Sequence, residues 1–208
     1  MTAPAFVAGL DLGQQNDYTA LSIAQIARTP RNGPDPTPHP FSLAVRHLER
    51  YTLHTPYPTM VESVAERVHR VREMGRLILV VDATGVGRPV VDLFRLARLG
   101  VPIWPVTIAT SAMGRATRDP VTGEFTVPKK DLIGALVSLA HAGRLAISDQ
   151  LPEAATFTQE LRSFRMKITT SLNVTFDPWR EGAHDDLVLS VALACWAANR
   201  WASPGGLS

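Results

Sequence analysis

Residues 76–82, "RLILVVD", place five apolar residues between an arginine and an aspartate. A short apolar run without polar alternation is typical of a strand that is covered on both faces. Each covered face needs a layer of its own, and helices supply such layers in α/β proteins. The run therefore predicts a sheet between two helical layers, with Asp82 at the end of a central strand.

The rest of the sequence predicts the elements around this strand. Three successive strands are expected at residues 5–13, 18–27 and 41–53, the third at an edge; a proline-rich loop at 28–40 precedes the third. Helical spacing of apolar residues predicts helices over 59–74, from the glycine turn after Asp82 to Gly100, over 130–141, from Pro152 onward, and from His184 onward. Further strands are expected at 101–108, 144–147 and 171–178, and a small hairpin at 118–128.

The order of these elements predicts the topology. Strands joined by short turns pair antiparallel, whereas strand-helix-strand units place parallel strands side by side. We therefore expect an α/β, ribonuclease H-like three-layer fold, in which a mixed sheet of three antiparallel strands and then parallel ones is flanked by helices, with a small extra hairpin. Residues 1–208 are expected to form one domain with an ordered core of about 5–200.

Carboxylates stand at the ends of predicted strands and at a helix start. Asp11 ends the apolar run of the first strand, Asp82 ends the central strand, and Asp185 and Asp186 begin the last helix. Acidic groups in such positions are unfavourable unless they are paired or bind a cation. Oxygen ligands favour a hard ion, Mg²⁺ or Mn²⁺. One of the paired aspartates can instead cap the helix, and Asp185 is the more suited to that role.

Composition removes several other classes. The single cysteine, Cys195, excludes an internal disulfide and a zinc site built from cysteines. The formal net charge is only +2, so attraction to a polyanion must come from local basic residues. No apolar run reaches the roughly 18–20 residues of a membrane span, and the start of the sequence lacks a signal-peptide pattern. We expect a cytoplasmic protein without a membrane partner.

Three stretches together resemble a known family: "GLDLGQQNDYTAL", "LVVDATGVGRPVVDLF" and "HDDLVLSVALA". They are similar to the nuclease domain of the large terminase subunit of tailed bacteriophages, which cuts concatemeric DNA during packaging. The segments "VPKKDLIGALVSLAHAGRLAI" and "ATFTQELRSF" resemble the middle of that domain, so the similarity extends from about Phe6 to Ala198. It implies a metal-dependent DNA endonuclease of low sequence specificity, related to RuvC resolvases.

The resemblance also implies roles for individual residues. Asp11 would bridge two Mg²⁺ or Mn²⁺ ions, Asp82 would bind one, and Asp186, with or without Asp185, would complete the other. His184 would orient a carboxylate or assist a proton transfer. For the phosphates of double-stranded DNA, the basic residues near these acids are the candidates: Arg88, Arg115, Arg118, Lys129 and Lys130.

The family further implies partners and a setting. They are an ATPase domain, the small terminase subunit and the capsid portal, in the cytoplasm of a host bacterium. The sequence contains no G-x-x-x-x-G-K-[ST] phosphate loop, so no ATPase motor domain is expected within it. Two alternatives remain: a RuvC-like junction resolvase, and an actin-like ATP-binding protein, whose phosphate loop also follows a strand with a D-x-G pattern.

Overall fold

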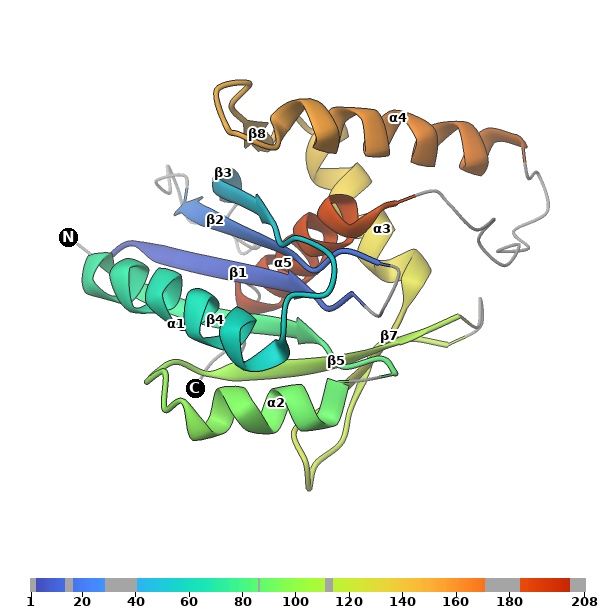
Figure 1. The fold of residues 1–208 in the computed structure, drawn as a ribbon. Helices are drawn as coiled ribbons and strands as arrows, with labels where there is room; N and C mark the ends of the chain where they lie inside the picture. The colour runs from blue at the N-terminus through green and yellow to red at the C-terminus, as the bar shows by residue number, and fades with distance from the viewer. Residues whose placement is uncertain are drawn as a thin grey trace, which may run out of the picture.

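The computed structural model describes residues 3–13, 17–28, 41–85, 87–110, 114–170 and 184–202. In this part of the chain, one eight-stranded sheet is covered by helices on both faces (Figure 1). The strands are β1 (Ala5–Asp11), β2 (Ala20–Arg28), β3 (Phe41–Arg50), β4 (Arg76–Asp82), β5 (Ile103–Ala109), β6 (Thr117–Arg118), β7 (Phe125–Pro128) and β8 (Leu145–Ile147). The helices are α1 (Tyr57–Met74), α2 (Gly87–Leu96), α3 (Lys129–His141), α4 (Ala154–Thr170) and α5 (Asp186–Ala202).

The strand order across the sheet is β6-β7-β5-β4-β1-β2-β3-β8. The first three strands pair antiparallel, and β4 and β5 continue the sheet parallel to β1 on its other side. This mixed arrangement confirms the topology predicted from the order of the elements. It places the carboxyl ends of β1 and β4 next to each other at one edge of the sheet.

One strand prediction is corrected, and another is confirmed with an added pairing. The third strand is not an edge strand, because β8 pairs with it in parallel over Leu43–Val45. The predicted small hairpin is confirmed as β6 and β7, and β7 also extends the main sheet by pairing in parallel with β5. In both cases the short strand forms hydrogen bonds with backbone N–H and C=O groups of the longer strand that would otherwise lie unpaired at the edge of the sheet. The predicted strand at 171–178 and residues 29–40 of the predicted loop at 28–40 lie outside the described residues, whereas Arg28 ends β2.

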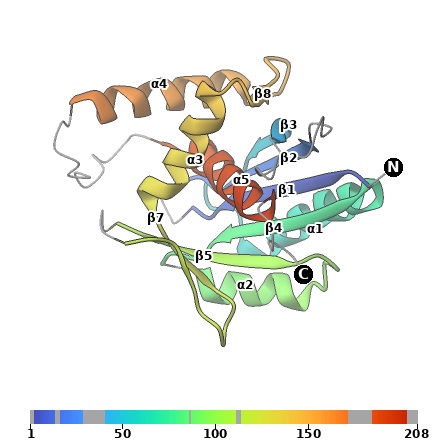
Figure 2. The same ribbon diagram turned by 180° about the vertical axis from the view of Figure 1, so that it is seen from behind.

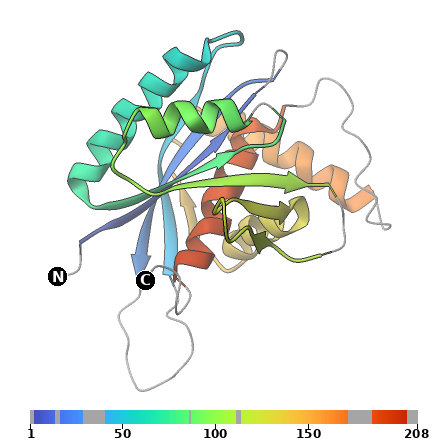
Figure 3. The same cartoon turned by 90° about the horizontal axis from the view of Figure 1, so that it is seen from below.

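The two faces of the sheet bury different sets of side chains. In β4, Ile78 and Val80 join the core under α3 and α5, whereas Leu77, Leu79 and Val81 join the core under α1 and α2. Successive side chains of a strand point to opposite faces, so a strand covered on both sides must be apolar throughout. Figures 2 and 3 show the two helical layers, with α4 beside α5 on the α3 side. No helix among the described residues is long and apolar enough to cross a membrane.

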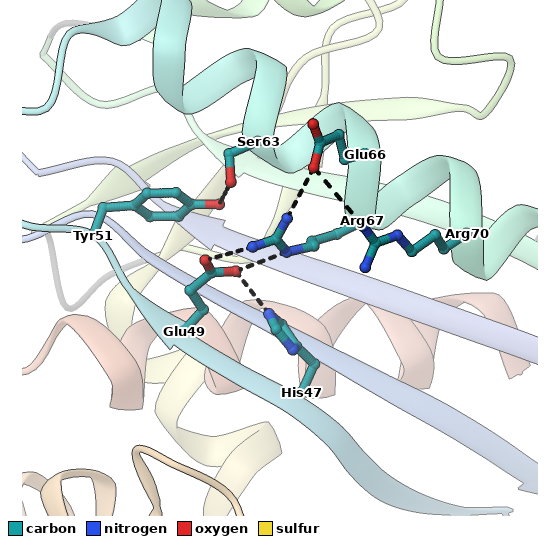
Figure 4. A network of polar contacts seen from close by, with 7 residues as sticks. All are labelled: His47, Glu49, Tyr51, Ser63, Glu66, Arg67 and Arg70. Carbon is teal, nitrogen blue, oxygen red and sulfur yellow. Dashed lines mark hydrogen bonds and ion pairs between the residues drawn. The ribbon is translucent and has the colours of Figure 1, made fainter.

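A polar network connects β3 to α1 (Figure 4). Glu49 on β3 binds Arg67 on α1 through both carboxylate oxygens, at 3.0 and 3.2 Å, and lies 2.8 Å from Nε2 of His47. On the same face, the Tyr51 hydroxyl donates a hydrogen bond to Ser63 on α1. The hydrogen bond with His47 and the pairing with Arg67 lower the pKa of Glu49, while burial opposes the shift.

Replacing Glu49 by glutamine is expected to lower the free energy of unfolding at pH 7 by about 1 kcal/mol, because the two-pronged contact with Arg67 loses its charge. A lowered pKa adds stability above the pKa of the unfolded state, and that stability is lost as the pH falls through the folded pKa. The difference between the two proteins should therefore shrink below about pH 4.5. Urea unfolding at pH 7 and at pH 3.5 measures it.

Glu66 provides the matched control, since its side chain also contacts Arg67 but is 64% exposed. The substitution Glu66→Gln should change the free energy of unfolding by no more than about 0.5 kcal/mol at either pH. An equal effect of both substitutions would show that the half-buried pair of Glu49 and Arg67 contributes no more to stability than the exposed contact of Glu66.

Candidate functional site

Asp11 and Asp82 lie side by side at the carboxyl ends of β1 and β4. The strands pair in parallel with Leu10 opposite Val81, so the two aspartates follow on adjacent strands. Both are nearly buried, with exposures of 6% and 8%. Each lies an even number of residues after a side chain of the α5-facing core, Val7 or Ile78, so both carboxylates point towards α5.

Helix α5 brings the other two predicted acids to this place. Asp186, its first residue, is 4% exposed, and its Oδ2 atom is buried without a hydrogen-bond partner among the described residues. The imidazole Nδ1 of His184 lies 3.8 Å from that oxygen. Asp185 lies one residue earlier, and its carboxylate is 3.5 Å from the Lys129 ammonium at the start of α3. Asp186 thus has a buried carboxylate oxygen that accepts no hydrogen bond from the described residues.

The carboxylates influence one another strongly. Burial raises the pKa of Asp11 well above its ordinary value, and the negative charges of Asp82, Asp186 and Asp185 raise it further. Burial also raises the pKa of Asp82, although hydrogen bonds from Thr84 oppose the shift. Burial, followed by neighbouring acids, raises the pKa of Asp186 to about 7. The site therefore gathers more negative charge than its protein surroundings balance.

Lys129 lies within this cluster, although the sequence suggested it only as a contact for DNA phosphates. Its side chain is 11% exposed. Burial lowers the pKa of Lys129, whereas the attraction of Asp185, Asp11 and Asp82 raises it. The ammonium group thus acts first on the protein's own acids. Its role in DNA binding stays a prediction.

The other basic candidates surround the hairpin. Arg88 at the start of α2 is exposed and lies 3.4 Å from Glu124 before β7. Arg118 of β6 packs its guanidinium over the Phe125 ring at 5.3 Å, and Arg115 is exposed on the approach to that strand. Lys130 follows Lys129 on α3 and is partly buried. Their contacts with DNA also stay predictions.

Sequence reasoning missed Glu160 and Arg50. Glu160 on α4 is 6% exposed, and burial raises its pKa to about 7. Its carboxylate accepts a hydrogen bond from the backbone N–H of Val188 on α5 and pairs with Arg50 at the end of β3. One signal was present: Glu160 stands three residues after the buried Phe157, on the apolar side of its helix. An acid in an apolar stripe needs a partner inside the protein.

The donor set fits a hard divalent cation. Among the described residues, no group of three or more histidine, cysteine, aspartate and glutamate side chains is arranged to hold a metal ion. The chemistry nevertheless matches, since Asp11, Asp82 and Asp186 offer buried oxygens that repel one another, and one oxygen has no hydrogen bond. A cation removes both unfavourable features. Binding requires the carboxylates to draw together.

Comparison with known proteins gives the fold a precedent. Neither family models nor curated protein sequences give a match. Among solved structures, the nuclease domain of the human cytomegalovirus terminase matches with a TM-score of 0.51 and 12% identity over 93% of this chain and 84% of that domain. A manganese-soaked structure of the same domain matches with a TM-score of 0.50 and 12% identity over 91% of this chain and 81% of that domain. RuvC of Thermus thermophilus is more distant, with a TM-score of 0.39 and 14% identity over 93% and 94%. The chain therefore has the ribonuclease H-like fold of a terminase nuclease domain.

Proposed function

We propose that this chain is a metal-dependent DNA endonuclease. The observation that carries the proposal is the placement of Asp11 and Asp82, two buried and mutually repelling acids, together with the unpartnered oxygen of Asp186. Uncharged side chains at these positions would make the folded protein more stable, because each buried acid is unfavourable for folding. On a fold shared with a terminase nuclease domain, cation binding for phosphodiester hydrolysis accounts for these acids.

The proposed site divides the work between metal ions and protein groups. Asp11, Asp82 and Asp186, with or without Asp185, would hold two Mg²⁺ or Mn²⁺ ions, which supply a nucleophile at neutral pH and offset the charge on the departing 3′ oxygen. Lys129 holds Asp185 in place through their ion pair. His184, whose Nδ1 lies 3.8 Å from Oδ2 of Asp186, would orient that carboxylate.

The finer role that we propose is the cutting of concatemeric viral DNA during genome packaging by a tailed bacteriophage. In that setting the chain would act in the host bacterial cytoplasm with an ATPase domain, the small terminase subunit and the capsid portal. The arginines around the hairpin and Lys130 would contact DNA phosphates, which carry no base information. Low sequence specificity follows from contacts of that kind.

Supercoiled plasmid provides the direct test. We expect the purified chain to produce nicked and linear DNA at low salt with Mn²⁺ and to leave the plasmid supercoiled with a chelator. Intact plasmid in the presence of Mn²⁺ at low salt would refute the proposal. A synthetic four-way junction in parallel reactions identifies a RuvC-like resolvase, which would cut the junction in preference to plain duplex. Measurable binding of ATP would instead favour an actin-like protein.

A further inference from the structure

A carboxylate from another helix accepts a hydrogen bond from the amino-terminal end of α5. The carbonyl of Asp185 accepts the first intrahelical hydrogen bond, from Leu189, so Asp185 is the N-cap residue and Val188 stands third in the helix. A backbone N–H at that position has no partner inside its own helix. Oε2 of Glu160 on α4 accepts it at 3.2 Å. Glu160 therefore caps α5 from outside.

Glu160 is itself fixed by side chains that lead back to Asp186. Its Oε1 lies 3.4 Å from Nη1 of Arg50, whose guanidinium stacks over the Tyr18 ring at 4.3 Å. Tyr18 meets the imidazole of His184 edge to face, with 4.9 Å between ring centroids, and His184 approaches Asp186. These contacts close a ring around the first turn of α5, called here the support ring: Tyr18, Arg50, Glu160, His184, Asp186 and the Val188 backbone.

The support ring joins four separate parts of the chain at one carboxylate. Tyr18 precedes β2, Arg50 ends β3, Glu160 lies in α4, and α5 contributes its own first turn. Within the ring, Glu160 places a second buried negative charge beside Asp186, which is unfavourable for stability alone. The positive end of the α5 dipole and the guanidinium of Arg50 offset only part of this cost, since burial still raises the pKa of Glu160 to about 7. An acid is thus retained where an uncharged acceptor could form the same cap.

We propose that Glu160 is a positioning residue for the metal site: by capping Val188 from α4, it fixes the first turn of α5 and holds the Asp186 carboxylate towards Asp11 and Asp82. The inference rests on the proposed function, because it concerns how one of the proposed ligands is presented. Partners behind metal ligands typically change metal affinity by roughly 10–100-fold when they are removed. Glu160 touches neither substrate nor metal in this role.

The test is the affinity of the full chain for Mn²⁺, measured by titration calorimetry, with thermal unfolding of each variant recorded alongside. Glu160→Ala should weaken Mn²⁺ binding by at least about tenfold. Glu160→Gln keeps an oxygen that can accept the Val188 N–H, so its affinity should stay within about threefold of the parent. If the alanine variant fails to fold, Glu160→Asp replaces it, because the shorter side chain withdraws the acceptor from α5.

Two controls on the same helix separate positioning from general loss of stability. Gln159 is exposed, and Gln159→Ala should leave Mn²⁺ binding unchanged. Phe157 is buried outside the support ring, and Phe157→Ala should lower the melting temperature while the folded protein keeps its Mn²⁺ affinity. An equal loss of affinity in Phe157→Ala would overturn the inference.

The remaining outcomes distinguish the inference from the proposed function. Parent-like Mn²⁺ affinity in Glu160→Ala, or binding in Glu160→Gln as weak as in the alanine variant, overturns the positioning role and leaves the metal site standing. Absence of Mn²⁺ binding by the parent chain refutes the metal site itself, and the inference falls with it. The positioning role of Glu160 is supported if the parent binds Mn²⁺, Glu160→Ala binds it more weakly, and Glu160→Gln binds it about as tightly as the parent.

Discussion

Asparagine in place of Asp11 is expected to reduce Mn²⁺-dependent DNA cleavage by at least about 10³-fold, because a direct ligand should matter more than the partners behind it. The change is nearly isosteric. Asp11 shares a hydrogen bond with the neighbouring carboxyl of Asp82, and the amide of asparagine can donate to that same oxygen. The fold should therefore survive while the charge that attracts the cation is removed.

The same substitution is expected to raise the stability of the metal-free protein at pH 7.5. The pKa of Asp11 is raised by burial and by neighbouring acids. As the pH rises above the pKa of the unfolded state, the unfolded chain releases a proton that the folded chain retains, so stability falls until the folded pKa is passed. Asparagine does not titrate, so the variant escapes this loss. Activity and stability should thus change in opposite directions.

Plasmid cleavage and urea unfolding with and without Mn²⁺ measure both effects. Mn²⁺ should stabilise the parent, since it binds the folded chain, and should leave the Asp11→Asn variant almost unchanged. Asp92→Asn is the control, because Asp92 is 63% exposed on α2 and pairs only across the helix surface with Arg95. Cleavage by Asp11→Asn at the parent rate would contradict the metal site, whereas a marked loss of stability would contradict the electrostatic argument.

The fold was largely predictable because its strongest signals are local. The apolar run of β4 implied cover on both faces, and the order of the elements implied which strands pair in parallel. The pairing of β8 with β3 was not predictable, since it joins Leu43–Val45 to Leu145–Ile147 across about a hundred residues of chain. Nothing in three apolar residues specifies which edge they will complete.

The convergence of the acids could be anticipated from strand ends and one helix start, but their surroundings could not. Lys129 is one of two adjacent lysines in the sequence, and only the packing of α3 against α5 decides that its ammonium meets Asp185. The sequence suggested equal roles for both lysines. A lysine that contacts DNA phosphates must be exposed, whereas one that pairs with buried acids is not. This exposure depends on the tertiary structure.

The position of Arg50 near the site was not predictable from the sequence for a different reason. Its direction depends on an irregularity in β3, where Ile23 pairs with His47 and Ala24 pairs with Val45, so Arg46 is an extra residue. Before this bulge the odd-numbered side chains Phe41, Leu43 and Val45 enter the core under α5, and after it the even-numbered Leu48 does so. The bulge thereby turns Arg50 towards Glu160 and Glu49 towards α1. Regular alternation in the sequence predicts the opposite faces.

Gly9 connects the fold to the site, and its replacement by alanine is expected to damage both. Gly9 lies on β1 two residues before Asp11, on the face that α5 covers. A Cβ atom there would collide with the carbonyl oxygen of Ser190 and lie 3.0 Å from the backbone nitrogen of Ala194. Both obstacles are backbone atoms, so α5 must move away from the sheet. Overpacking that cannot be relieved by a side chain should lower the free energy of unfolding by about 3 kcal/mol or more.

The shift of α5 should also impair cleavage at temperatures where the Gly9→Ala variant remains folded. Ser190 stands one helical turn after Asp186, so a movement that clears Gly9 also displaces the Asp186 carboxylate from Asp11 and Asp82. A misplacement of about 1 Å lowers catalytic rates by roughly 10²-fold. Gly134 is the matched control: it lies exposed in α3, and apart from the backbone of its own helix turn no atom lies within 4 Å of the added Cβ. Gly134→Ala should stabilise by about 0.8–1 kcal/mol without loss of cleavage. Normal cleavage by folded Gly9→Ala would mean that the acids tolerate displacement of α5, whereas the combined loss would show that one missing Cβ atom sets the distance between the helix and the strand that carry the site.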